Sequence, residues 1–361
     1  MKFIFPVDGD VITPADGRLD ENGKLFFEAK IESDPGDHIE LNGLEMTESQ
    51  PSVYTLEMTL DGYRNALTAE DKNGKKEVVY VYRFKNADKK FRLAIDDIIR
   101  SMRDLAEHDY ASVFDQPFFR LFRDIHEKTG VLIQFNIYFT DNNGFDLTMF
   151  PARYKDEFRS VSDWLKLTFH AIADQPDRIY RYTPYREILR DYNLVTNEIL
   201  RFAGPETMNT AVNGLHWAET TREGARALRA AGIRCLVGYY IFDENGDPHV
   251  AYYLDRDQTI HASRRDFWVD NSEGIIFSKD KMVIDSFALE DIEPYLDDLR
   301  DNHPTEAGTM NFVTHEQYFY ESYKGYQKDY GEKILRAVNW AVKNGYEPCF
   351  LDKVINESYP Y

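Results

Sequence analysis

The chain has 361 residues, of which 43% are hydrophobic and 14% aromatic, a composition typical of a folded globular protein. Its 63 acidic residues outnumber the 43 basic ones, so the formal net charge is −20. Because this charge repels nucleic acid phosphates and anionic lipid surfaces, the sequence predicts neither a nucleic acid partner nor a membrane, and leaves neutral ligands such as sugars open.

The first residues bear on the location of the protein. The opening "MKFIFP" is shorter than the apolar region of roughly 7–15 residues in a signal peptide, which predicts a cytoplasmic protein. A truncated extracytoplasmic protein would begin in the same way, so that alternative stays open. The two cysteines, Cys235 and Cys349, predict no disulfide framework.

Residues 1–88 have the pattern of a small all-β sandwich. Segments such as "SVYTLEMTL" and "KEVVYVYRF" are rich in β-branched and aromatic residues, as strands are. Asn-Gly pairs lie between such segments and supply the positive φ angles that tight hairpins need. We expect an accessory domain here.

Residues 89–361 alternate between strand and helix patterns. Helices are expected from Thr183-Pro184 to Gly204, from a capping box at Thr220 to Gly232, and up to Gly345. This order predicts an α/β domain whose parallel sheet is closed, or nearly closed, into a barrel. The β-like pieces within 243–287 are interpreted as an insertion. The apolar strand candidates are 91–95, 130–139, 163–169, 209–215, 234–242 and 309–314.

Polar residues follow four of these strands. Asp96 and Asp97 end the first, and His170, His216 and His315 follow three others. Because the carboxyl ends of barrel strands meet on one face, we expect these side chains to lie together. Each also has a structural interpretation, since the two aspartates fit the N-cap of a helix beginning at Ile98 and a single histidine is often a hydrogen-bonded core residue.

This residue set suits a metal-dependent hydrolase. A divalent cation, of which zinc is the leading candidate, binds imidazole and carboxylate and activates a water molecule. A second carboxylate beside the ligands can act as general base, and a histidine opposite it as general acid.

The motifs "AIDD" (94–97), "KLTFHA" (166–171) and "NFVTHE" (311–316) resemble those of the polysaccharide deacetylase superfamily. The resemblance extends over about residues 88–352. It implies a distorted seven-stranded (β/α) barrel and the metal-assisted removal of N- or O-acetyl groups from a glycan.

The resemblance also implies residue roles. Asp96 corresponds to the catalytic base, Asp97 and His170 to metal ligands, and His315 to the general acid. The family's second motif pairs two histidines separated by three residues, whereas Asp174 follows His170 here. The third ligand is therefore either Asp174 or His216, which lies where the family usually has an Arg-Pro-Pro motif.

Three further residues are expected to contact a carbohydrate substrate, namely Trp217, Glu316 and Tyr318. The tyrosine-rich stretch 315–330 either stacks on sugar rings or packs against the neighbouring domain. The main alternative function is a non-catalytic carbohydrate-binding protein with a degenerate barrel. Glycoside cleavage ranks third, because adjacent Asp96 and Asp97 cannot flank a bond and Glu316 would have to serve as a distant partner.

Overall fold

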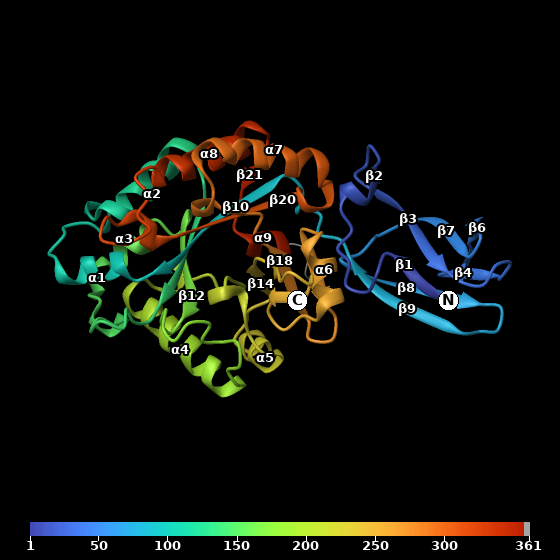
Figure 1. Ribbon diagram of the computed structural model, residues 1–361, viewed down its shortest axis with the longest axis horizontal. Helices are drawn as coiled ribbons and strands as arrows, with labels where there is room; N and C mark the ends of the chain where they lie inside the picture. The colour runs from blue at the N-terminus through green and yellow to red at the C-terminus, as the bar shows by residue number, and fades with distance from the viewer. Residues whose placement is uncertain (357–361) are drawn as a thin grey trace.

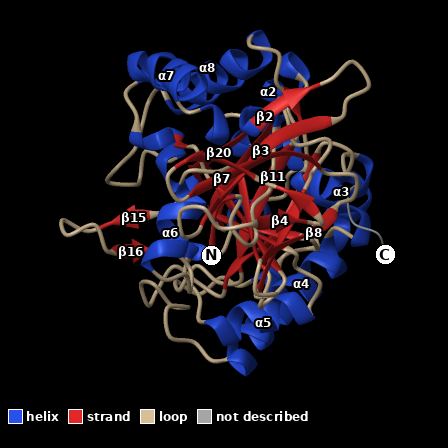
Figure 2. Ribbon diagram, turned by 90° about the vertical axis from the view of Figure 1, so that its right-hand side faces the viewer, coloured by secondary structure: helices blue, strands red, loops and turns tan. Residues whose placement is uncertain are grey.

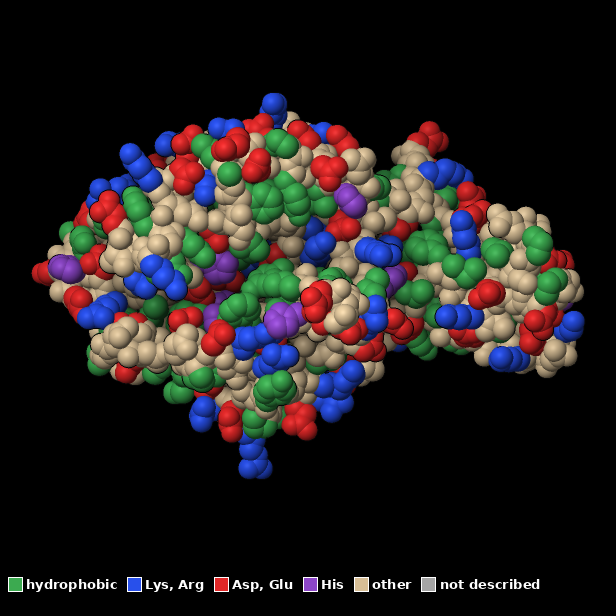
Figure 3. Space-filling view, in the orientation of Figure 1, with side chains coloured by type: hydrophobic (Ala, Val, Ile, Leu, Met, Phe, Trp, Pro, Cys, Tyr) green, Lys and Arg blue, Asp and Glu red, His purple; other side chains and the backbone are tan. Residues whose placement is uncertain are grey.

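The computed structural model describes residues 1–356, with an all-β N-terminal part lying beside a larger α/β part (Figure 1). No helix among residues 1–356 is long and apolar enough to cross a membrane. On the face seen in Figure 3, acidic and basic side chains are interspersed rather than gathered into one patch.

The N-terminal part consists of two antiparallel sheets that share one hydrophobic core. The alternating pattern of 25–32 buries every second side chain, as expected for a half-buried strand. Both Asn42 and Gly43 have positive φ and form the tight turn predicted for an Asn-Gly pair. One sheet contains β1 (Lys2–Phe5), β2 (Gly17–Leu19), β3 (Leu25–Glu32), β6 (Thr47–Gln50) and β7 (Val53–Thr59), and the other β4 (Ile39–Leu41), β5 (Leu44–Glu45), β8 (Arg64–Asp71) and β9 (Lys76–Tyr82).

The α/β part is built on a parallel sheet, which confirms the predicted mixed α/β class. Its central strand, β10 (Lys90–Ile98), runs parallel to both neighbours, β11 (Ile133–Tyr138) and β20 (Thr309–His315). All six residues of β11 are buried, as in sheets covered by helices on both faces. The outer strands are β12 (Leu165–Ala171) and β19 (Met282–Val283), and the short β21 (Glu347–Pro348) pairs parallel with the start of β10.

A second sheet adjoins the first. Asn209 N donates to Leu167 O, and Thr168 Oγ1 donates to Asn209 O at 3.1 Å, so the chain before β13 contacts β12 without forming a regular ladder. The closed seven-stranded barrel stays a prediction. The sheet holds β13 (Val212–Asn213), β14 (Cys235–Gly238) and β18 (Ile275–Lys279) in parallel, with β17 (Phe267–Asp270) antiparallel to β18.

Part of the predicted insertion at 243–287 belongs to the sheets instead. The segments "GIIFS" and "KMVIDSF" contain β18, which pairs parallel with β14, and β19, which pairs parallel with β20. Their apolar runs are too short to distinguish a sheet strand from a loop strand by sequence. The added elements are the hairpin β15 (Ile241–Phe242) and β16 (Pro248–Val250), which projects from the body in Figure 2, and α6 (Arg256–Ser263).

Helices cover the sheets on both sides, with α2, α7 and α8 on one side and α4 and α5 on the other (Figure 1). The N-cap of α5 is Thr221, one residue after the predicted Thr220, and its hydroxyl accepts from Gly224 N. The remaining helices are α1 (Arg100–Glu107), α2 (Pro117–Thr129), α3 (Lys155–Ser160), α4 (Tyr185–Phe202), α5 (Arg222–Ala230), α7 (Ile292–Asn302), α8 (Tyr330–Lys343) and α9 (Leu351–Asn356).

The first turn of α1 is capped by Glu316, and the N-cap interpretation of Asp96 and Asp97 is therefore wrong. Strand β10 continues to Ile98, and the helix begins at Arg100. The fully buried Glu316 carboxylate accepts hydrogen bonds from the backbone N–H groups of residues 99, 100 and 101, each at 2.7 Å. A carboxylate in this position satisfies three orphan donors and complements the helix dipole. Because it is so engaged, Glu316 does not lie among the cavity residues, contrary to the expectation that it contacts substrate.

Replacing Glu316 with Ala is expected to destabilise the protein by about 2–4 kcal/mol, because buried N–H groups lose their acceptor. Urea unfolding measures this change, with the exposed Glu321→Ala as the matched control, for which a change below about 0.5 kcal/mol is expected. A Glu316→Ala protein of wild-type stability would contradict the capping role.

Candidate functional site

The backbone is irregular where the two aspartates leave β10. Pairing with β11 is regular up to Ile95 and shifts register before Ile98. Asp97 lies between them with φ of 65°, in the left-handed region that few residues other than glycine adopt. Such strained positions cluster at functional sites, and here the irregularity turns the Asp97 side chain toward two imidazoles.

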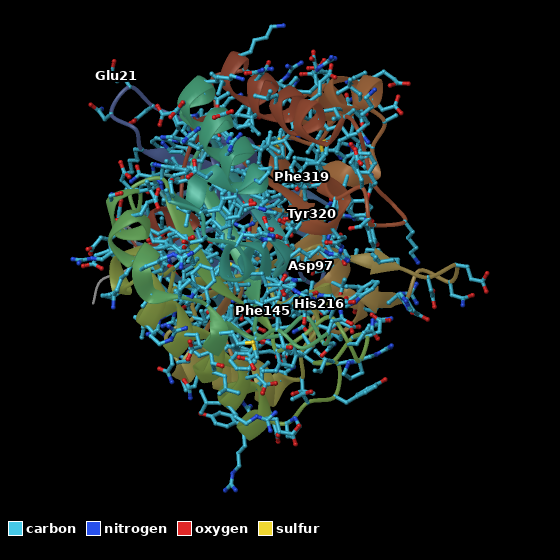
Figure 4. The ribbon with its side chains drawn as sticks, turned by 90° about the vertical axis from the view of Figure 1, so that its left-hand side faces the viewer. Glu21, Asp97, Phe145, His216, Phe319 and Tyr320 are labelled. Atoms are coloured by element: carbon cyan, nitrogen blue, oxygen red, sulfur yellow. The ribbon has the colours of Figure 1, made fainter. Side chains whose placement is uncertain are left out.

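Asp97, His170 and His216 form a compact cluster of candidate metal ligands. His170 Nε2 lies 3.1 Å from Asp97 Oδ1, and His216 Nδ1 lies 3.5 Å from the same oxygen. The two imidazole nitrogens are 3.3 Å apart. Asp97 and His216 are labelled in Figure 4, where they lie close together.

These separations fit a zinc ion. Tetrahedral zinc with bonds of about 2.0–2.1 Å keeps its ligand atoms about 3.3 Å apart. His170 Nδ1 lies 2.6 Å from Gly214 O, so it carries the proton and leaves Nε2 free as a ligand. Gln317 Nε2 donates to the other Asp97 oxygen at 2.8 Å. The donor set and its surrounding hydrogen bonds thus fit a divalent metal ion.

Without a cation, the charges of the cluster compensate one another. Burial raises the pKa of Asp97, but hydrogen bonds from His170 and His216 bring that pKa well below its usual value. Burial lowers the pKa of His170, but the carboxylates of Asp96 and Asp97 raise it overall. A divalent cation that binds here would compete with protonation of His170.

Asp96 and His315 lie beside this cluster as direct partners across the β10–β20 pair. Asp96 Oδ1 accepts from Asn136 Nδ2, and Asp96 Oδ2 lies 4.0 Å from His170 Nε2. His315 Nδ1 lies 2.9 Å from Asp285 Oδ2. Burial lowers the pKa of His315, but Asp285 and the more distant aspartates raise it to about 10.

The site opens into a cavity of about 670 Å³. The structure brings Asp96, Asp97, His170, His216 and His315 together on its wall, as the strand ends predict.

The remaining expected residues lie at the rim. The Asp174 side chain is 65% exposed, with Oδ1 3.9 Å from His216 Nε2, and does not join the ligand cluster. Trp217 lies beneath Arg178 with φ of 62°, and the ring of Tyr318 contacts His315 edge-on. Both aromatic residues line the cavity, whereas Glu316 does not.

Four side chains that hydrogen-bond to these five residues are not among those that the sequence predicts. Asn136 and Tyr138 lie on β11, Asp285 follows β19, and Gln317 comes two residues after His315. The strand-end rule that selects the histidines points to Thr140 here, because the predicted strand 130–139 ends one residue after Tyr138. Asp285 is missed because its strand is interpreted as part of an insertion.

Neither a protein-family model nor a curated protein matches this sequence. Among solved structures, the Xyl-CE4 domain of a xylanase from the hindgut metagenome of Trinervitermes trinervoides matches with 11% identity and a TM-score of 0.35, over 76% of this chain and 95% of that one. A peptidoglycan N-acetylglucosamine deacetylase matches with 9% identity and a TM-score of 0.38, over 74% and 89%. A CE4 family pseudoenzyme from Bacillus anthracis matches with 10% identity and a TM-score of 0.32, over 75% and 67%.

With identities of 9–11% and TM-scores below 0.5, these matches carry no argument about this chain, and the chemistry of the site follows from its own side chains.

The position of Asp174 leads to a test of the third ligand. His170→Ala and His216→Ala are each expected to abolish stoichiometric zinc binding, whereas Asp174→Ala retains it, because only the first two remove a clustered ligand atom. Inductively coupled plasma mass spectrometry of dialysed protein measures the zinc content. If Asp174→Ala lost zinc and His216→Ala retained it, Asp174 and not His216 would be the third ligand.

Proposed function

We propose that the protein is a metal-dependent hydrolase that removes N- or O-acetyl groups from a glycan. The observation that carries this proposal is the cluster of Asp97, His170 and His216 flanked by Asp96 and His315 at one cavity. Metal-assisted hydrolysis of an acyl group needs a ligand cluster with a base on one side and an acid on the other, and these five residues supply all three parts.

Asp97, His170 and His216 would hold the cation. A bound divalent ion such as zinc lowers the pKa of water and polarises an acyl carbonyl. Three protein ligands would leave room for water or substrate at the ion, as in catalytic rather than structural zinc sites.

Asp96 is the proposed general base. Asn136 holds one of its oxygens, and the other faces His170 at the cluster. This oxygen takes a proton from the attacking water while the Asn136 hydrogen bond fixes the carboxylate plane. Asp96 does not belong to the ligand cluster, so its carboxylate is available for this role.

His315 is the proposed general acid. The carboxylate of Asp285 binds Nδ1, which leaves Nε2–H to donate a proton to the departing amine or alcohol oxygen. The pKa of about 10 keeps the imidazole protonated at neutral pH. Hydrolysis then yields acetate and the free amino or hydroxyl group of the sugar.

The cavity supports a carbohydrate substrate. Trp217 and Tyr318 offer aromatic faces beside the reacting groups, and half-buried Tyr239 lines the same wall. Sugar rings bury their C–H faces against aromatic side chains, which give large contact areas. A neutral glycan also avoids the repulsion that the net charge of −20 imposes on anionic ligands.

Asp96→Asn is expected to lower kcat by about 10²–10⁴-fold while zinc content stays unchanged, because the base is lost and the ligands remain. The assay measures acetate released from N-acetylglucosamine oligomers and from acetylated xylo-oligosaccharides. Wild-type protein with bound zinc that binds these sugars but releases no acetate would favour the non-catalytic carbohydrate-binding protein.

Asp285→Asn tests the general acid. Asp285 raises the pKa of His315, so its replacement is expected to lower that pKa by about 1–3. The His315 imidazole then loses its proton at a lower pH. The pH at which kcat falls on the alkaline side is expected to decrease by the same number of pH units. NMR titration of the His315 imidazole in metal-free protein measures the pKa independently of turnover. An unchanged imidazole pKa would contradict the assignment.

A further inference from the structure

The hydroxyl of Tyr138 lies among the candidate ligand atoms. Tyr138 is the last residue of β11 and is 2% exposed. Its Oη donates to Asp97 Oδ1 and lies 2.8 Å from His216 Nδ1. The phenol thus contacts two of the three atoms that would hold a metal ion.

Tyr138 also separates the cluster from a second depression. A groove of about 930 Å³ meets the cavity at residues that line both, including Asp97 and Gln317. Tyr138 lines this groove and not the cavity, whereas His170 and His216 line the cavity and not the groove. The phenol therefore covers the ligand cluster on the groove side.

The geometry points to Tyr138 as the positioning residue of the metal centre. Its hydroxyl would hold Asp97 Oδ1 in place as a ligand, and its ring covers the cluster on the groove side, away from the cavity that Asp96 and His315 line. This inference rests on the proposed metal site.

The need for a donor at Asp97 follows from the chemistry of the cluster. In the metal-free chain, both imidazoles can donate to Oδ1. Once His170 Nε2 and His216 Nδ1 give their lone pairs to a metal ion, neither nitrogen donates. Tyr138 is then the remaining donor to Oδ1 among the hydrogen bonds of residues 1–356.

Both oxygens of the carboxylate are thereby fixed from separate elements. Gln317, which follows β20, holds Oδ2, and Tyr138 on β11 holds Oδ1. Asp97 has a left-handed backbone conformation, so regular strand geometry does not fix the direction of its side chain. Hydrogen bonds of this kind around metal ligands are worth about 10–100-fold in affinity.

Tyr138→Phe tests the inference, because it removes one oxygen and keeps the ring. Competition with a chromophoric chelator measures the zinc dissociation constant, which is expected to rise by about 10–100-fold. Tyr110→Phe is the matched control. Its hydroxyl lines the same groove and donates to Asp104, 3.2 Å away, so its removal is expected to leave zinc affinity within about twofold.

The outcomes separate this inference from the proposed function. Wild-type protein that binds no zinc would overturn both. Zinc binding that is equal in wild type and Tyr138→Phe would overturn only the positioning role. A tyrosinate charge-transfer band in Fe³⁺-loaded wild type, absent from Tyr138→Phe, would show that the phenol ligates the metal and would overturn positioning. Weaker zinc binding without such a band, at an unchanged melting temperature of the metal-free protein, supports the inference.

Discussion

The buried carboxylate of Asp97 is the group on which the arrangement of this site depends. An ionised carboxylate removed from water is costly unless donors or cations surround it. Here two imidazoles, a phenol and an amide converge on its two oxygens. These donors stabilise the buried charge. They also leave three candidate ligand atoms close enough together to hold a metal ion, so stabilisation of the fold and binding of a cation would use the same residues.

Parallel strand register brings the proposed catalytic pair together. Asp96 and His315 are far apart in sequence but stand opposite each other across β10 and β20. Because both strands run in the same direction, their carboxyl ends reach the same edge, and the loops that follow are free of ladder hydrogen bonds. The strands thus fix the positions of the proposed base and acid. Asp285, on the segment after β19, favours the protonated form of His315.

Much of the site is predictable from strand ends, and the errors have physical causes. Successive side chains of a strand point to opposite faces, so His315 faces the cavity and Glu316 faces the first turn of α1. This alternation can be inferred from the sequence, and it argues against Glu316 as a substrate contact. By the same rule Asp96 and Asp97 should diverge, but Asp97 adopts a positive φ, which its sequence neighbours do not specify, and both residues line the cavity.

The proposal that His216, and not Asp174, is the third metal ligand has a consequence for the fold. His170 ends β12 and His216 follows β13, and these two strands belong to different sheets with no regular ladder between them. The contacts across this seam include His170 Nδ1 to Gly214 O and Asn213 Nδ2 to Phe169 O. A metal ion held by both imidazoles would add a connection across the same seam, beside the backbone hydrogen bond from Asn209 N to Leu167 O, and ion binding favours the folded state. A second histidine four residues after His170, on the same loop, would bind metal without making that connection. The proposed ligand set would therefore couple metal binding to the contact between the two sheets.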